Sequence, residues 1–417
     1  MEEKEIFSNI AGYQDIKKEL LMIRNWFLNN TNLENEFIKL PRGILFEGTP
    51  GTGKSLFLIE YAASFDAPKI IVEGDEDNIS MEIHKAFEES KKYKFSLILI
   101  DEIDLLIGGR SDISRTLQAE MDGVNSNSNC LVLATTNTIN RIDNALKRSG
   151  RFDRIIEVYN PDNENRKELL KLYINKIGLK GNIDIDYLSK VLYGVSCADI
   201  MAILNDVYLR KGNNITTEDI EVSYYRVTTK MLCSEKKFDP SKANIEIAYH
   251  EIGHALMCYK NRSFFTFYRA GFSSNYRNGR TKYFPEDMLK KTVDIEFMKI
   301  EILLGGHAMT NLKFNKVDGG SYNDLLEAKE EIDFLVDNIG YFGIDKTLRF
   351  FTDDERLESE TRKRKNEALK EKLILKVYKS VRKYLKKNMM KVDALVSLMM
   401  TKGFINNKDL ISVMEKA

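Results

Sequence analysis

The sequence contains little of what marks a secreted or disulfide-bonded protein. Among its 417 residues there are only four cysteines, which lie far apart and form no C-x-x-C pair. This distribution argues against a disulfide framework and favours a reducing compartment. We expect small, buried, hydrophobic side chains at all four positions, which are Cys130, Cys197, Cys233 and Cys258.

An excess of charge and a long apolar run are also absent. Lys+Arg and Asp+Glu number 63 each, so nothing in the net charge favours nucleic acid or an anionic membrane as a partner. No run of about 18 apolar residues exists, and the start at Met1 lacks the core of a signal peptide. We therefore expect a cytoplasmic chain that does not span a membrane. Any native anchor would precede Met1 and would hold the chain at the cytoplasmic face.

The composition is that of an ordinary globular protein, with 43% hydrophobic and 30% charged residues. A chain of this length is too long for one hydrophobic core, which predicts two or three domains. From residue 6 to 160, strand-like runs alternate with helical patterns such as Ile79–Lys92 and Ser114–Glu120, as in a parallel α/β sheet. The expected strands are Gly43–Phe46, Lys69–Val72, Ser96–Ile100, Leu131–Ala134 and Ile155–Val158.

Beyond residue 160 the patterns become mainly helical. We expect a large subdomain at 1–160, a helical lid at 161–232, a linker at 233–244 and a second domain at 245–417. Within the second domain, the aromatic and glycine-rich stretch Phe264–Phe284 could form a small strand pair. The charged stretch Glu355–Lys387 is typical of a solvated bundle helix.

A glycine-rich segment follows the first expected strand and matches the G-x-x-x-x-G-K-[ST] pattern of a P-loop. Its residues are Gly48, Thr49, Pro50, Gly51, Thr52, Gly53, Lys54 and Ser55, and Leu56 opens the helical pattern that follows. Backbone N–H groups in such a loop, together with the start of the helix, bind phosphates. We expect Lys54 to reach the β- and γ-phosphates of ATP, and the Ser55 hydroxyl to bind Mg²⁺.

An acidic pair, Asp101 and Glu102, follows a buried strand-like run. A carboxylate at the carboxyl end of the strand beside a P-loop can hold Mg²⁺ through water, which is the role expected of Asp101. Glu102 is then placed to polarise the attacking water.

A second pattern, His250-Glu251-x-x-His254, lies in a stretch that should be helical. Histidines at i and i+4 project from one face and can chelate one zinc ion, with Glu251 as general base toward the zinc-bound water. Gly253 costs about 1 kcal/mol against alanine inside a helix, so something other than helix propensity places it there. A catalytic zinc also needs a third protein ligand, and Asp324 is one candidate carboxylate among many.

Three segments, Asp101–Asp104, Ala134–Asn137 and Arg148–Arg154, together resemble the motif set of AAA ATPases. The resemblance implies that Asn137 is the polar sensor between the P-loop and the acidic pair. It also implies that Arg148 and Arg151 are fingers that complete the neighbouring subunit's site, which requires a ring, a homohexamer. By the same resemblance, 7–12 and 194–199 lie beside the adenine and the phosphates.

The pairing of this ATPase with H-E-x-G-H resembles the FtsH family of AAA metalloproteases over nearly the whole chain. The resemblance implies an α/β P-loop domain with a helical lid, followed by a mainly helical, zincin-like protease domain. It makes Asp324 the third zinc ligand and Arg280–Phe284 an edge strand beside the cleft, which can hold an extended peptide by main-chain pairing. The implied function is ATP-dependent zinc endopeptidase, with ATP, Mg²⁺ and one Zn²⁺ per subunit.

The sequence departs from this family in the pore loop between the P-loop helix and the acidic pair. The interval Val72–Glu82 is short and has no aromatic residue, and its only apolar candidates for substrate contact are Ile79 and Met81, both of which could instead face the core. The segment Gly305–Asn311 also lacks the family's acidic residues. Two alternatives therefore stay open: an ATP-gated peptidase limited to loosely folded chains, and a remodelling ATPase with a vestigial protease.

Overall fold

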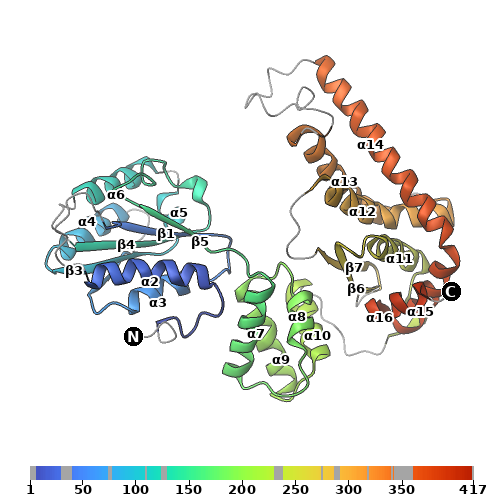
Figure 1. Cartoon of the computed structure of the whole chain (residues 1–417), viewed down its shortest axis with the longest axis horizontal. Helices are drawn as coiled ribbons and strands as arrows, with labels where there is room; N and C mark the ends of the chain where they lie inside the picture. The colour runs from blue at the N-terminus through green and yellow to red at the C-terminus, as the bar shows by residue number, and fades with distance from the viewer. Residues whose placement is uncertain are drawn as a thin grey trace. The chain divides into compact units, whose positions relative to one another are not determined.

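The computed structural model describes residues 6–29, 40–73, 78–108, 110–123, 129–229, 238–273, 276–285, 292–316, 319–339, 341 and 360–415. The chain divides into two compact units, Met1–Lys230 and Met231–Ala417, called unit 1 and unit 2 below (Figure 1). The finer boundaries expected at residues 160, 232 and 244 stay predictions. No helix within the described ranges is both long and apolar enough to cross a membrane.

Unit 1 contains a five-stranded parallel sheet in the order β2-β3-β4-β1-β5. The strands are β1 (Gly43–Glu47), β2 (Lys69–Ile71), β3 (Phe95–Ile100), β4 (Asn129–Thr136) and β5 (Arg154–Glu157). All five expected strands are present, with ends shifted by at most two residues. The central strands are continuous apolar runs because helices cover both faces of the sheet.

Those covering helices are α2 (Gln14–Asn29) and α3 (Lys54–Ala63) on one face, and α4 (Ile79–Ser90), α5 (Ile103–Ile107) and α6 (Ser111–Gly123) on the other (Figure 1). The second group forms one hydrophobic cluster with inward residues of the strands, such as Leu45 and Ile98. A crossover helix between parallel strands brings the carboxyl ends of β1, β3 and β4 to one edge. The P-loop and the acidic pair both follow strands at that edge.

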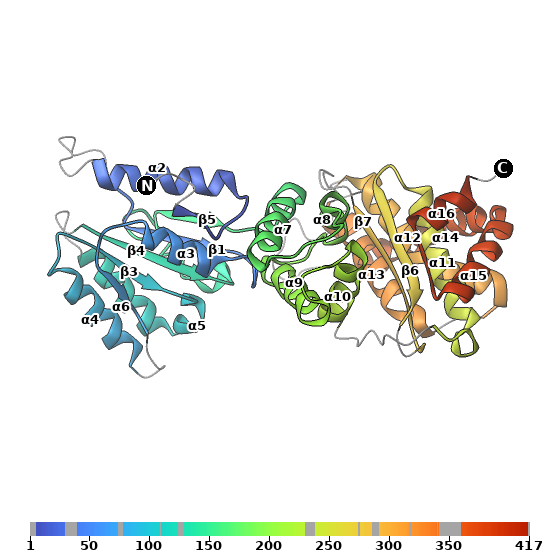
Figure 2. The same ribbon diagram turned by 90° about the horizontal axis from the view of Figure 1, so that it is seen from below.

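Four helices follow the sheet: α7 (Asn163–Ile177), α8 (Ile185–Val191), α9 (Cys197–Lys211) and α10 (Thr217–Thr229) (Figure 2). The first three begin at residues whose side chains accept a hydrogen bond from the first turn, Asp162, Asp184 and Ser196. This is the stretch in which the sequence predicted short helices.

Unit 2 is mainly helical, with a small antiparallel sheet in the order β7-β6-β8. Its elements are α11 (Ile245–Lys260), β6 (Phe265–Phe272), β7 (Gly279–Pro285), α12 (Val293–Phe314), α13 (Tyr322–Asp333), α14 (Glu360–Lys387), α15 (Met389–Lys402), β8 (Phe404–Asn406) and α16 (Asn407–Met414). The expected strand pair is confirmed as β6 and β7, whereas β8 was not predicted. The described part of the long charged helix begins at Glu360; residues 355–359 of that prediction lie outside the described residues.

Helix α11 is the centre of unit 2. Every residue from Ala248 to Tyr259 is buried, and its apolar side chains belong to one cluster with residues of α12, α14, α15 and the sheet. At its crossing with α12, a Cβ added to Gly253 would collide with the Gly305 carbonyl oxygen, and one added to Gly305 would meet the Gly253 carbonyl. This close approach is the reason for Gly253 that the helical pattern alone did not supply.

The cysteine prediction is confirmed within the described ranges, where Cys130, Cys197 and Cys258 are free and buried. Cys233 and the first residues of the expected linker lie outside the described residues. The described part of that linker contains a short 3-10 turn, Pro240–Lys242, and ends at Asn244, whose side chain accepts a hydrogen bond from the first turn of α11.

Candidate nucleotide and metal sites

The P-loop connects β1 to α3 as the sequence predicted. Gly48, Gly51 and Gly53 all have positive φ, at 149°, 81° and 103°, a region that favours glycine. Lys54 is buried at the start of α3, and its Nζ donates a hydrogen bond of 2.9 Å to the Thr49 carbonyl within the same loop. Burial lowers the pKa of Lys54, against the opposing effect of the nearby carboxylates. The lysine ammonium group is thus held inside the loop that would surround a phosphate.

The acidic pair lies beside this loop. Ser55 Oγ donates to Asp101 Oδ1 over 3.0 Å, and Thr135 Oγ1 donates to the same oxygen over 2.5 Å. The Glu102 N–H donates to Thr135 Oγ1, and Asn137 Nδ2 donates to Glu102 Oε1 over 3.2 Å. Four residues expected at this edge of the sheet, Ser55, Asp101, Glu102 and Asn137, are therefore neighbours. Thr135, which sequence reasoning had not singled out, links the Asp101 carboxylate to the Glu102 main-chain N–H.

A cavity of about 330 Å³ extends from the P-loop. Asn9, Ile10, Ala11 and Tyr13 line it from the N-terminal segment, and Leu169, Tyr173, Cys197, Ala198 and Met201 line it from α7 and α9. The Ala198 N–H donates to the Gly51 carbonyl over 3.0 Å, so the start of α9 touches the P-loop. Both segments that the resemblance placed beside the nucleotide contribute to the lining. Leu169 and Tyr173 were missed because they belong to an otherwise ordinary helical pattern.

The two arginines expected to act as fingers differ in their surroundings. Arg148 is exposed. Arg151 makes a bidentate ion pair with Asp122, through Nε at 2.9 Å and Nη2 at 2.7 Å, and its Nη1 donates to the Ala145 carbonyl. Their action on a neighbouring subunit stays a prediction.

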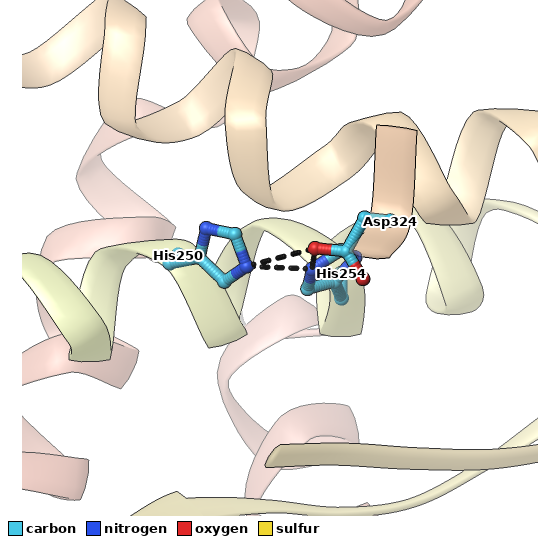
Figure 3. A group of neighbouring side chains, drawn as sticks. All are labelled: His250, His254 and Asp324. Carbon is cyan, nitrogen blue, oxygen red and sulfur yellow. Dashed lines mark hydrogen bonds and ion pairs between the residues drawn. The ribbon is translucent and has the colours of Figure 1, made fainter. Parts of the chain in front are cut away.

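In unit 2, the first turn of α13 brings Asp324 to the two histidines of α11. Figure 3 shows the Asp324 carboxylate pointing at both imidazole rings. Its Oδ2 lies 3.1 Å from His250 Nε2 and 3.3 Å from His254 Nε2, and the two Nε2 atoms lie 3.1 Å apart. Among the described residues, this is the only group of three or more His, Cys, Asp or Glu side chains close enough to share a metal ion.

The geometry of this triangle fits zinc. A tetrahedral zinc ion about 2.0–2.1 Å from each ligand atom places those atoms about 3.3 Å apart. His254 Nδ1 lies 2.7 Å from the Ile302 carbonyl; since a carbonyl only accepts, Nδ1 carries the proton and Nε2 presents its lone pair. A Cβ added at Gly306 of α12 would overlap both imidazole rings. Glycine there leaves the rings their space.

Electrostatics within the triangle favour a bound cation. Burial alone would raise the pKa of the Asp324 carboxyl, but its hydrogen bonds with His250 and His254 hold that pKa well below its usual range. Burial alone would lower the pKa of His254, but Asp324 and Glu251 raise it to about 9. A metal ion that binds these three side chains replaces the protons that they would otherwise share.

Glu251 lies next to the first histidine and is 5% exposed. Its burial raises the pKa of the carboxyl, and its Oε2 lies 2.6 Å from Thr281 Oγ1 on β7. The other two histidines lie elsewhere: His84 contacts Glu120 in unit 1, and His307 packs against the ring of Tyr378.

The interval expected to form the pore loop is only partly described, since residues 74–77 lie outside the described ranges. Ile79 is buried in the core beneath the sheet, so its interpretation as a substrate contact is wrong. Met81 is 51% exposed, which leaves it as the one apolar candidate in the described part of this interval.

Comparison with known proteins gives two family matches. Residues 44–160 match the ATPase family associated with various cellular activities (AAA), and residues 238–413 match peptidase family M41. The chain is 30% identical over 446 residues to the ATP-dependent zinc metalloprotease FtsH of Karelsulcia muelleri, an alignment covering 98% of this chain and 71% of that protein. It is also 30% identical to FtsH 2 of a Thermoanaerobacter species, with 98% and 83% covered.

Proposed function

The chain belongs to the FtsH family of ATP-dependent zinc metalloproteases, and from this premise we propose how its residues carry out ATP-driven proteolysis. ATP and Zn²⁺ are its cofactors. The observation that carries the proposal is that one chain holds both a P-loop cavity in unit 1 and the His250, His254 and Asp324 triangle in unit 2.

In unit 2, His250, His254 and Asp324 hold the zinc ion, as the distances between their ligand atoms support. When bound, the ion supplies Lewis-acid polarisation of the scissile carbonyl and of the attacking water. Glu251 takes a proton from that water and passes it to the leaving amine. Its burial supports this role, because a raised pKa makes the carboxylate a stronger acceptor for the proton of the water.

In unit 1, Lys54 contacts the β- and γ-phosphates of ATP, the Ser55 hydroxyl would bind Mg²⁺, and Asp101 would hold the same ion through water. The 3.0 Å contact of these two side chains supports a shared metal. Glu102 orients the attacking water. Asn137, which donates a hydrogen bond to the Glu102 carboxylate, senses the γ-phosphate. The residues from Gly48 to Leu56 surround the phosphates, and the lid helices close over the adenine.

We place these sites in a homohexameric ring that acts on polypeptides in the cytoplasm or at the cytoplasmic face of a membrane. Arg148 and Arg151 reach the neighbouring subunit's γ-phosphate. The exposure of Arg148 supports this, while Arg151 must first leave its ion pair with Asp122. The free, buried cysteines support a reducing compartment.

A second candidate function is a peptidase that acts only on loosely folded chains. The described part of the pore interval offers Met81 and no exposed aromatic residue, so the ring would grip a substrate weakly. That favours an ATP-gated peptidase whose substrates are loosely folded. A remodelling ATPase with a vestigial protease is disfavoured, because the proposed zinc ligands and base lie together.

The test compares Glu102→Gln and Glu251→Gln on unfolded casein with ATP and zinc. Glu102→Gln should bind ATP but hydrolyse almost none. Glu251→Gln should lose proteolysis while keeping its zinc and most of its ATP turnover. Undiminished ATP hydrolysis in the first variant, or undiminished cleavage in the second, would overturn the corresponding assignment.

A further inference from the structure

Strand β7 reaches the proposed general base through a threonine. Thr281 Oγ1 lies 2.6 Å from Glu251 Oε2 and 3.0 Å from the Glu251 main-chain carbonyl oxygen. Within the described residues, this hydroxyl makes the only hydrogen bond to the Glu251 carboxylate. A buried carboxylate that lost it would be left without a partner.

A second residue of strand β7, Gly279, lies against the Glu251 side chain. A Cβ added at Gly279 would lie 2.5 Å from Glu251 Cγ and 2.5 Å from Oε1. Residues two apart on a strand share a face, so Gly279 and Thr281 both turn toward α11. Strand β7 thus leaves space for the Glu251 side chain at one position and holds it by a hydrogen bond at the other.

From this arrangement we infer that Thr281 is a positioning residue for Glu251, and that Gly279 provides the space in which the carboxylate is held. The inference rests on the proposed function, in which Glu251 is the base. Thr281 does not touch the reacting atoms. It fixes the direction from which the carboxylate approaches them.

A hydroxyl suits a base that changes its protonation state within each turnover. A threonine hydroxyl has one hydrogen to donate and lone pairs to accept. When Glu251 is ionised, the hydrogen points to Oε2. When Glu251 carries the proton taken from water on Oε1, Oε2 is the carbonyl oxygen of the carboxyl group and still accepts from the threonine hydroxyl. One side chain therefore holds the carboxyl in both states.

This arrangement also connects substrate binding to the base. Strand β7 is at the edge of its sheet, paired with β6 on one side only in the described residues. An extended peptide that added to the other side would lie directly along the strand that carries Thr281.

The experiment compares Thr281→Val, which keeps the shape and removes the hydroxyl, with Thr281→Ser, which keeps the hydroxyl. Cleavage of labelled casein is measured at varied substrate concentration by the full chain with ATP and zinc. For Thr281→Val we expect kcat to fall roughly 10- to 100-fold with KM changed less than about 3-fold, since a hydrogen bond to a charged group is lost. Thr281→Ser should restore kcat to within about 3-fold of wild type.

Zinc content and ATP turnover should be unchanged in both. A matched control is Thr401→Val, because Thr401 is exposed on α15 and bonds only its own helix; it should behave as wild type. Gly279→Ala should lower kcat in the same direction as Thr281→Val. Wild-type kcat in Thr281→Val, or a loss that serine does not rescue, would overturn the inference.

Crystal structures of the zinc-loaded wild type and Thr281→Val separate this inference from the proposed function. Glu251 should bond Thr281 in the first and adopt another side-chain conformation in the second. Wild type that fails to cleave casein at all would refute the proposed function, and the crystal structures would still decide the role of Thr281. If Glu251 keeps its wild-type conformation in Thr281→Val, the positioning role of Thr281 is wrong.

Discussion

Replacing Gly306 by alanine should weaken zinc binding while leaving the protease unit folded. The added Cβ would overlap His254 Nε2 and His250 Nε2, so one or both rings must move by several tenths of an ångström or more. Zinc–nitrogen bonds of about 2.0–2.1 Å tolerate little of that displacement. We expect zinc affinity to fall about 10- to 100-fold, the range found when groups supporting a metal ligand are changed.

The fold should survive because two opposing effects act on it. Overpacking a buried site costs about 1–3 kcal/mol, whereas alanine gains about 1 kcal/mol over glycine inside a helix such as α12. The net change in the free energy of unfolding should therefore be about 2 kcal/mol or less.

The assay is equilibrium competition for zinc with a chromophoric chelator, combined with casein cleavage at rising zinc concentration. Excess zinc should recover much of the lost cleavage. The control is Gly319→Ala, because a Cβ at Gly319 meets no atom within 4 Å; its zinc affinity should equal that of wild type. Wild-type affinity in Gly306→Ala would show that the rings have room to spare, and the reasoning from close contact would be refuted.

Three further outcomes follow from the site. Asp324→Ala removes a proposed ligand, so zinc content measured by atomic absorption should drop; full occupancy would require another third ligand. Arg151→Ala should lower ATP turnover about 10³-fold or more with nucleotide affinity kept, and mixing it with Lys54→Ala should restore some activity; no recovery despite subunit exchange would exclude action in trans. Casein should be cleaved rapidly, while a folded domain with a free energy of unfolding of about 10 kcal/mol largely escapes cleavage. Met81→Ala should reduce the residual cleavage of that folded domain. Rapid cleavage of the folded domain by the unaltered chain would contradict a weak grip on the substrate.

Much of the nucleotide site could be predicted from the sequence because its signals are local. A P-loop is one uninterrupted segment, and Asp101 and Glu102 directly follow a strand. Once the strands are assigned, parallel pairing brings their carboxyl ends together. Thr135 escaped notice because its link to both residues of the acidic pair depends on β3 and β4 being neighbours in the sheet.

Unit 2 was predicted less completely because its contacts join distant segments. The H-E-x-x-H pattern placed two proposed ligands on one helix, but Asp324 followed only from the family resemblance. Strand β8 has three residues, too few for a pattern, and pairs with β6 from far along the chain. Thr281 and Gly306 have no sequence signal of their own, since their roles come from elements that pack against α11.

The burial of α11 bears on the order in which the protein becomes a protease during synthesis. Asp324, the proposed third zinc ligand, lies 74 residues after His250, and the side chains of α14, α15 and α16 that share the core of α11 come later still. Until the ribosome has released those helices, the apolar face of α11 that packs against them is left uncovered. The ATPase unit, made first, can fold earlier. We therefore expect a nascent chain to complete its nucleotide site before its protease site.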